Sequence, residues 1–194
     1  MSRPNPVIKD TLLDAAETIA ARDGVARLTF DAVAAEAGVS KGGVLHYFTT
    51  KDQLIEGMVK RTATRWRDYF KAAYDNEPEG PGRMTRGLLK SCFTDAQTWT
   101  EALRRAFGSV FAALAHNPAL IEPMREAYTE FYHYVEQDGL PPGVAESVTT
   151  AMDGLWFYWV LRLRPVNQGD LDRMRGALEL TLDDALKSVA QAAA

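Results

Sequence analysis

Few residues in this sequence have the type and spacing of a catalytic or metal-binding site. Glu130 and His133 are three positions apart, as in one half of a helix-bundle di-iron site, which also needs a second Glu-x-x-His pair and two further carboxylates. The sequence has no second pair. Its histidines are dispersed and its one cysteine is Cys92, which supports neither a zinc site nor a Cys-His nucleophile. We therefore expect no metal, no cofactor and no catalytic residue, and a helical-bundle enzyme is a remote alternative.

A pattern near the N-terminus has the spacing of a helix-turn-helix. This motif needs a small residue inside its first helix, a turn residue that tolerates a left-handed backbone, and apolar residues that lock the two helices together. Ala34 is the small residue, and Gly38 follows four positions later. The locking positions hold Val33, Val39, Val44 and Tyr47. The pattern favours a DNA-binding motif and leaves a helical hairpin without a DNA role as the alternative.

Four helices are expected to position this motif. The spacing of apolar residues predicts them over about 6–23, 30–37, 41–48 and 51–76. Thr29, Ser40 and Thr50 stand where a side-chain oxygen caps the second, third and fourth helices. Thr50 and Gln53 also have the spacing of a capping box.

The rest of the chain is also expected to be helical. The segment 77–83 (EPEGPGR) is rich in proline and glycine and ends the fourth helix. Apolar residues then predict helices over about 84–98, 101–115, 119–137, 144–163 and 170–190. Asp170 stands where it would cap the last of them. No segment alternates like a strand, so we expect an all-α protein.

The residues from Thr29 to Leu54 read TFDAVAAEAGVSKGGVLHYFTTKDQL, and this stretch resembles the DNA-binding region of TetR-family transcriptional repressors. The resemblance covers about residues 8–60. It implies three N-terminal helices at the DNA and a long fourth helix that links them to a helical bundle. We accordingly expect a DNA-binding domain over residues 1–50 and a ligand-binding and dimerisation domain over 51–194, with the fourth helix as the link.

The resemblance also assigns phosphate-contacting roles to individual residues. These are Thr29, Ser40, Lys41, Tyr47 and Lys51. The physical chemistry agrees, because Ser40 can cap the recognition helix while its amides face a phosphate, and Lys51 is a point charge beside a helix N-terminus. Capping alone is the alternative for Thr29 and Ser40.

Two glycines and three neighbours complete the expected DNA contacts. Gly42 and Gly43 each weaken a helix by about 1 kcal/mol relative to alanine, and their lack of side chains permits close approach to the groove. Base reading then falls on Lys41, Val44, Leu45 and His46. At Leu45 the family usually has tyrosine, so a phosphate contact is lost or replaced by an apolar contact, for example with a thymine methyl group.

Aromatic residues are concentrated after the third helix, where they can line a pocket as well as build a core. The residues we expect to line a ligand pocket are Phe107, Phe111, Tyr128, Phe131, Tyr132 and Trp156. Each of them alone is more typical of a core residue than of a pocket lining. The expected function is a transcriptional regulator, most simply a repressor that a small apolar or aromatic ligand releases from its operator. The alternative is a regulator without a ligand, controlled by a protein partner or by abundance.

Two C-terminal helices are expected to form a homodimer. The helix over 144–163 is apolar nearly all round in its second half, and the helix over 170–190 has an apolar stripe. Together they suit a four-helix interface with a second copy of the chain. The alternative is that the domain itself buries the first of these helices.

Charge and composition limit which binding partners and which cellular compartment are expected. The 194 residues carry a net charge of −4, but residues 1–71 hold 11 basic and 9 acidic side chains, against 11 and 17 in the remainder. The two parts therefore suit different partners. A lone cysteine and the lack of a leader pattern favour the cytoplasm. The longest apolar run, 155–161 (LWFYWVL), is too short to span a bilayer, so no membrane association is expected.

Overall fold

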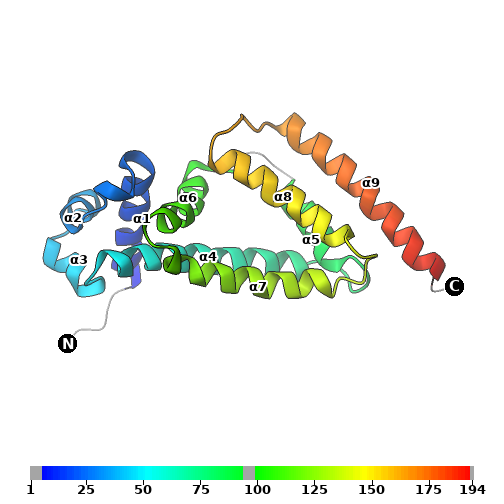
Figure 1. Cartoon of the computed structure of the whole chain (residues 1–194), viewed down its shortest axis with the longest axis horizontal. Helices are drawn as coiled ribbons and strands as arrows, with labels where there is room; N and C mark the ends of the chain where they lie inside the picture. Colours follow the sequence, from blue (N-terminus) through cyan, green and yellow to red (C-terminus); the bar gives the residue numbers. More distant parts are fainter. Residues whose placement is uncertain (1–5, 94–98, 193–194) are drawn as a thin grey trace. The chain divides into compact units, whose positions relative to one another are not determined.

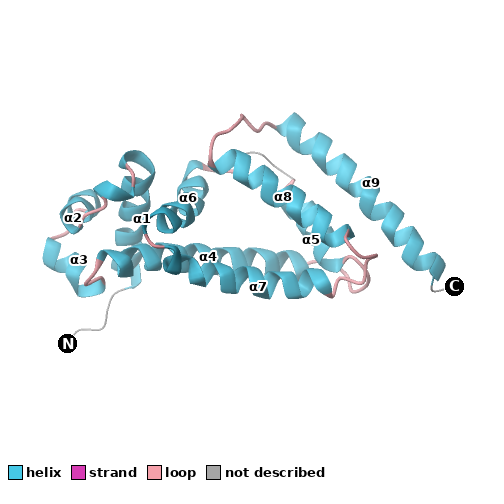
Figure 2. Ribbon diagram, viewed as in Figure 1, coloured by secondary structure: helices cyan, strands magenta, loops and turns pink. Residues whose placement is uncertain are grey.

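The computed structural model describes residues 6–93 and 99–192, which are mainly helical and contain no strand (Figure 1, Figure 2). The all-α prediction is thus confirmed. The chain divides into two compact units, Met1–Thr64 with Glu101–Glu126 and Arg65–Thr100 with Ala127–Ala194. The long helix α4 (Lys51–Asp75) contributes residues to both. None of the helices in the described ranges is long and apolar enough to cross a membrane.

The first unit is built around α1, which contacts both α2 and α6 (Figure 1). Its elements are α1 (Pro6–Asp23), the 3-10 helix η1 (Val25–Arg27), α2 (Phe30–Ala37), α3 (Lys41–Tyr47), the first part of α4, α6 (Glu101–His116) and the 3-10 helix η3 (Pro118–Ile121). Its buried apolar residues include Leu12, Ala16, Ile19, Leu28, Val33, Val44, Phe48, Ile55, Met58 and Ala106. This core holds the short helices α2 and α3 in place.

Local hydrogen bonds fix where the short helices begin, as the sequence predicts. The Thr29 hydroxyl accepts from the Ala32 amide at 3.2 Å, and the Ser40 hydroxyl accepts from the Gly43 amide at 3.1 Å. The Thr50 hydroxyl caps α4 through the Gln53 amide at 3.1 Å. The Gln53 side chain, however, accepts from the Thr49 amide rather than the Thr50 amide, so the capping box is displaced by one residue.

The second unit consists of the remainder of α4, most of α7 (Glu122–Glu136), and three further helices. These are α5 (Arg83–Cys92), α8 (Val144–Val160) and α9 (Gln168–Ala192). The last three contact one another pairwise. Large buried side chains of this unit include Phe70, Met84, Leu88, Phe93, Phe131 and Leu171.

A distant carboxylate fixes the start of α5. Asp138 accepts hydrogen bonds from the amides of Met84 at 2.7 Å and Thr85 at 3.0 Å, and also from the Thr85 hydroxyl at 2.5 Å. Helix α5 also packs closely on α4 at Gly87. A Cβ atom at this position would lie 2.2 Å from the Ala73 carbonyl oxygen of α4. Only glycine fits at that position.

Three predicted helix ends were wrong. The chain leaves α8 at Val160 rather than 163, because Arg162 adopts a left-handed φ of 55°. The cap of α9 is Asn167, not Asp170: the two residues exchange amide-to-side-chain bonds of 3.1 and 3.2 Å, so Asp170 lies inside the first turn. The helix predicted to begin near residue 119 begins at Glu122, because the 3-10 helix η3 (Pro118–Ile121) precedes α7. The predicted end of the helix over 84–98 lies outside the described residues.

Candidate functional site

Helices α2 and α3 form the helix-turn-helix that the sequence pattern predicts. Gly38 adopts a left-handed conformation, with φ 68° and ψ 29°, and ends α2. The Val39 amide donates to the Ala34 carbonyl at 2.9 Å, which closes the turn. Val33, Ala34 and Val44 are buried between the helices. The second helix of the motif is therefore held by its apolar side while its other side faces solvent.

The exposed side of α3 carries the residues predicted to contact DNA. Lys41, Gly42, Leu45 and His46 are exposed, and Leu45 is a large apolar side chain that is 39% exposed. Gly43 and Tyr47 are partly buried. Val44 is completely buried, so the expectation that it reads bases is wrong: it holds α3 in place.

Gly42 and Gly43 are not required by packing within the protein. A Cβ atom at Gly42 would have the Ser40 hydroxyl oxygen as its nearest neighbour, at 3.8 Å, and one at Gly43 would meet the same atom at 3.5 Å. These are ordinary contact distances, and neither glycine has a positive φ. The helix thus carries two helix-weakening residues for which the chain itself supplies no steric reason.

The predicted phosphate contacts surround this surface. Lys41 Nζ lies 2.9 Å from Asp31 Oδ2 in an exposed pair, which is readily opened to another anion. Lys51 Nζ donates to the Val25 carbonyl oxygen at 2.7 Å, which fixes the ammonium group beside η1 and leaves it further donors. The Tyr47 and His46 rings meet edge to face, with centroids 5.1 Å apart.

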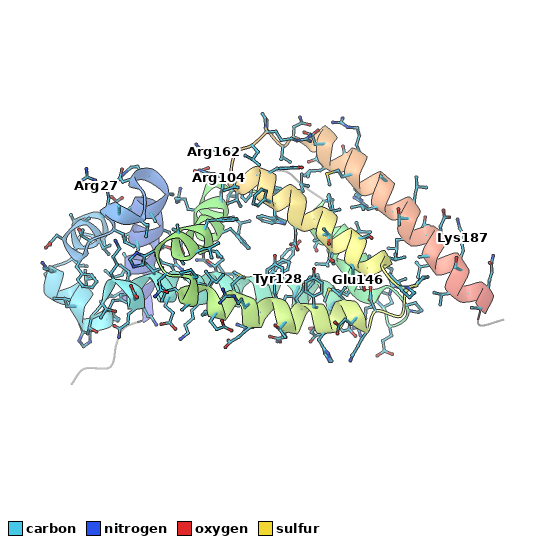
Figure 3. All side chains as sticks on the ribbon, viewed as in Figure 1. Arg27, Arg104, Tyr128, Glu146, Arg162 and Lys187 are labelled. Carbon is cyan, nitrogen blue, oxygen red and sulfur yellow. The ribbon has the colours of Figure 1, made fainter. Side chains whose placement is uncertain are left out.

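A hollow of about 540 Å³ opens beside Thr29. It is lined by Ile19, Asp23, Arg27, Thr29 and Ala32, all in the first unit. Arg27, labelled in Figure 3, is exposed at the end of η1. Arg27 is not among the residues expected from the sequence to contact DNA, although arginine is one of the side chains that commonly contact phosphates.

The six predicted ligand-binding aromatics fall into separate groups. Phe107 and Phe111 belong to α6 in the first unit, and the other four belong to the second unit. In that unit the rings of Tyr128 and Phe131 both contact Trp66, with centroid distances of 5.8 and 5.3 Å. The Tyr132 ring contacts Phe131, with centroids 5.6 Å apart. Phe131 is only 1% exposed and is a core residue in this structure.

Trp156 belongs to a second aromatic group. Its ring stacks on Trp99 with centroids 4.8 Å apart and meets Trp159 edge to face at 5.1 Å. The indole N–H of Trp156 also points to Cys92, with Nε1 and Sγ 3.4 Å apart. The lone cysteine is thus a buried neighbour of this group, and burial raises the pKa of its thiol.

Polar groups that the sequence analysis missed lie among these rings. The Tyr128 hydroxyl donates to Asp153 Oδ1 at 2.9 Å, and the Tyr69 hydroxyl donates to Ser91 Oγ at 3.1 Å. Burial raises the pKa of Asp153, although the bond from Tyr128 acts in the opposite direction. Burial and the adjacent Asp153 carboxylate raise the pKa of Tyr128. The hydroxyl therefore stays protonated as the donor.

The Glu130-x-x-His133 pattern has a different setting from a di-iron site. Glu130 Oε2 lies 2.9 Å from Arg67 Nε, and its other oxygen contacts Lys71 Nζ. These cations hold the pKa of Glu130 below its usual range. The carboxylate joins α4 to α7 by ion pairs.

Comparison with known proteins assigns the chain to a family. Residues 12–58 match the model described as bacterial regulatory proteins of the tetR family, and residues 82–183 match the tetracyclin repressor-like C-terminal domain. The chain belongs to the TetR family. It is therefore a DNA-binding transcriptional regulator, which decides against the enzyme alternative.

Similar proteins cover most of the chain. The HTH-type transcriptional regulator BetI of Serratia proteamaculans (strain 568) is 25% identical over 92% of this chain and 90% of its own length. BetI of Stenotrophomonas maltophilia (strain R551-3) is 25% identical over 78% of this chain and 80% of its own length. The fatty acid degradation regulator FadR from Bacillus halodurans shares the fold, with a TM-score of 0.68 and 15% identity over 91% of this chain and 96% of FadR.

A further solved structure is that of the multidrug binding protein EbrR complexed with malachite green. Its TM-score is 0.63, and it is 23% identical over 92% of this chain and 98% of EbrR. At this level of identity the likeness concerns the fold. The TetR-family regulators bind operators and small-molecule effectors, typically as dimers.

Proposed function

We propose that this regulator is a homodimeric repressor whose two helix-turn-helix motifs bind a near-palindromic operator. The observation that carries the proposal is the exposed side of α3, which combines Lys41, Leu45 and His46 with two glycines that packing does not require. In a dimer the two recognition helices must lie about 34–36 Å apart to enter successive major grooves. The DNA-binding domain proposed here is residues 1–50, and the effector and dimerisation domain is 51–194.

The proposed contacts divide into backbone-positioning and base-reading groups. Thr29, Ser40, Lys41, Tyr47 and Lys51 contact phosphates, and Arg27 joins them from the hollow beside Thr29. Leu45 and His46 face base edges, and Gly42 and Gly43 admit the backbone of α3 to the groove. Phosphate contacts set affinity and register, so changing them weakens binding to all sequences, whereas changing Leu45 or His46 alters sequence preference.

The proposed dimer uses exposed apolar residues of α8 and α9. Phe157 and Tyr158 of α8 and Leu161, which caps its C-terminus, are each more than 40% exposed, and Leu180 of α9 is 68% exposed. The apolar stripe predicted for α9 is a poorer candidate, because Leu171 and Leu182 are buried within their own unit. We therefore place the interface on the other side of α9, within the ranges 144–163 and 170–190.

Release by a small molecule is the regulatory part of the proposal. The effector is proposed to bind among the aromatic residues of the C-terminal domain, and the EbrR structures with ethidium and malachite green show that a protein of this fold accepts aromatic compounds. A ligand changes operator affinity only through different affinities for the DNA-binding and released states. If no compound changes operator affinity, the alternative of a regulator without a ligand is favoured.

Contacts between α6 and α4 offer a route for the signal within the first unit. Asp52 Oδ1 lies 2.9 Å from His116 Nε2, and Asp52 Oδ2 accepts from the Asn117 amide group at 3.2 Å. These bonds hold the pKa of Asp52 below its usual range. Because Asp52 follows Lys51, a displacement of the end of α6 reaches the proposed phosphate contact through two residues.

Selection of duplexes from random DNA by the purified protein tests the proposed operator binding. The expected product is a near-palindromic site whose affinity falls steeply with salt. Failure to retain any duplex at low salt would reject operator binding by the helix-turn-helix.

Because operator DNA is in the cytoplasm of a bacterium, we propose that compartment for the protein.

A further inference from the structure

An ion pair joins the two helices of the helix-turn-helix at the protein surface. Asp31 lies in the first turn of α2, and Lys41 is the first residue of α3. The Lys41 ammonium group donates to Asp31 Oδ2 at 2.9 Å, yet the side chains of Lys41 and Asp31 remain 54% and 72% exposed. Helices α2 and α3, which lie side by side in Figure 1, therefore present a donor and an acceptor next to each other.

Both members of the pair keep unused hydrogen-bonding capacity. An ammonium group has three N–H donors, and a carboxylate has two acceptor oxygens. Among the described residues, Asp31 Oδ2 is the partner of Lys41 Nζ, and Asp31 Oδ1 has no partner. The pair can therefore contact a third group on both sides without breaking its own bond.

The carboxylate stands beside residues proposed to contact phosphates, where a negative charge opposes DNA binding. Asp31 follows Thr29 by two positions, and its partner Lys41 directly follows Ser40. A carboxylate there repels phosphates and offsets part of the attraction that Lys41 supplies. Helix α2 does not need Asp31 as its cap, because the Thr29 hydroxyl already accepts from the Ala32 amide. An acid in the first turn also suits the helix dipole, but this effect is weak at an exposed position. The charge therefore calls for a role in DNA recognition itself.

The spacing of the pair matches the edge of one base pair in the major groove. There guanine presents two adjacent acceptors, N7 and O6, and cytosine presents the N4 amino group as a donor. Guanine O6 and cytosine N4 are bonded to each other and so lie about 2.9 Å apart. Lys41 Nζ and Asp31 Oδ2 are also 2.9 Å apart. With Lys41 at guanine and Asp31 at cytosine, each donor therefore faces an acceptor.

We propose that Asp31 and Lys41 together read one G·C base pair in each half of the operator, with guanine on the side of Lys41. One N–H of Lys41 serves the adjacent O6 and N7 atoms, cytosine N4 donates to Asp31 Oδ1, and a further N–H remains for the proposed phosphate contact. An A·T pair fits less well, because adenine N7 would repel the carboxylate and thymine offers the ammonium group O4 alone, beside a methyl group. This inference rests on the proposed operator binding and names a base pair that the operator contains.

Selection from random duplexes by the full-length protein identifies the base pair. Asp31→Ala is the decisive variant, and Glu36→Ala is its matched control, because Glu36 also belongs to α2 but pairs with Arg22 of α1 at 3.2 Å. The wild type should prefer G·C at one position of each half-site by about tenfold, which corresponds to about 1.4 kcal/mol. Asp31→Ala should lose this preference and keep the preferences at the other positions. Glu36→Ala should keep all of them.

Modified bases at that position test the two contacts separately. N4-methylcytosine replaces the amino hydrogen that faces the major groove, and 7-deazaguanine lacks the N7 acceptor. Measured by fluorescence anisotropy of a labelled operator, N4-methylcytosine should weaken binding of the wild type by about tenfold and leave Asp31→Ala unaffected. The 7-deazaguanine operator should bind the wild type less well than the unmodified operator does, whereas Lys41→Met should bind the two equally.

Base preference distinguishes this inference from a structural role and from the proposed function. A pair that only stabilises the motif would affect the affinity for all sequences equally, so an unchanged consensus in Asp31→Ala would overturn the inference while operator binding stands. Loss of preference at an A·T pair, or an equal effect of N4-methylcytosine on the wild type and Asp31→Ala, would also overturn it. A wild-type protein that retained no duplex would reject the proposed function and this inference with it.

Discussion

Lys51 shows how a single side chain combines a structural and a binding role. Its ammonium group donates to the Val25 carbonyl at 2.7 Å, so the position of the charge beside η1 is fixed before any DNA arrives. A fixed charge loses less conformational entropy on binding than a free lysine side chain does. The hydrogen bond therefore prepares the proposed phosphate contact.

Lys51→Ala should weaken binding to all duplexes and reduce the slope of log affinity against log salt concentration by about one, since one phosphate contact is lost. Lys51→Arg should retain the slope. Lys60→Ala on the same helix is the control, because Lys60 pairs with Glu56 away from the motif. The measurement is fluorescence anisotropy of a labelled operator over a salt series. An unchanged slope in Lys51→Ala would remove this residue from the contact set.

Asp153 makes a second prediction, which concerns stability without any ligand. Its folded-state pKa lies above that of the unfolded chain, near 3.9, so the folded protein binds the proton more tightly. The associated stability is present below about pH 4 and is lost as pH rises through the folded pKa. At pH 7 Asp153→Asn should thus unfold about 2–4 °C above the wild type.

The same difference should shrink toward pH 4, where both forms of the protein carry a neutral side chain at residue 153. Urea unfolding across this pH range measures it, and the change in stability between variant and wild type isolates Asp153 from the other carboxylates. A difference that is independent of pH would show that the carboxylate is not the cause.

The short helices could be predicted because their signals are local. Thr29 and Ser40 cap helices that start at the next residue, and Gly38 ends α2 in the conformation that glycine favours. The cap of α5 has no local signal, since Asp138 is more than fifty residues away and meets Met84 only in the folded chain. The same limit applies to Asp153: helical periodicity predicts α8, but its pairing with Tyr128 depends on tertiary packing.

Misassigned positions have equally specific causes. Val44 has the spacing of a base-reading residue, yet it also fills the gap between α2 and α3, and burial decides its role. Asp170 and Asn167 are both good capping residues, and each accepts a hydrogen bond from the amide of the other. Apolar periodicity does not show which of the two precedes the first turn of the helix and which lies inside it.

Helix α3 should become more stable and bind DNA less well when its glycines are replaced. Gly42→Ala and Gly43→Ala each add about 1 kcal/mol of helix propensity, and the protein has room for both Cβ atoms. Each should raise the thermal midpoint by about 2–4 °C. If the glycines admit α3 to the groove, operator affinity should fall by about tenfold.

Gly108→Ala on α6 is the control for this comparison, because its Cβ also meets nothing within 4 Å but lies outside the motif. It should raise stability and leave operator affinity intact. Calorimetric unfolding and anisotropy provide the two measurements. Unchanged operator affinity in both α3 variants would assign the glycines no role in DNA binding.

At the scale of the whole molecule, operator binding depends on assembly, because one motif reads only half of a palindromic site. A dimer fixes the distance between two recognition helices, and a ligand that changes this distance changes affinity for both half-sites together. The coupling is reciprocal: an effector that weakens operator binding is itself bound more weakly in the presence of operator, by the same factor. Typical couplings are about 1–3 kcal/mol, or roughly 5- to 150-fold.

Leu161→Glu and Leu180→Glu should therefore convert the dimer to monomers and abolish tight operator binding together. Both residues are exposed in the single chain, and burying an unpaired carboxylate at an interface costs several kcal/mol. Leu114→Glu on α6 is the matched control, since Leu114 is 45% exposed and Leu161 is 41% exposed. Light scattering at micromolar concentration gives the mass, and anisotropy gives the affinity for full and half sites. Because a monomer keeps its folded motif, weak half-site binding should survive. A wild-type protein with the mass of one chain would exclude the dimer. Dimers in both variants would place the interface elsewhere.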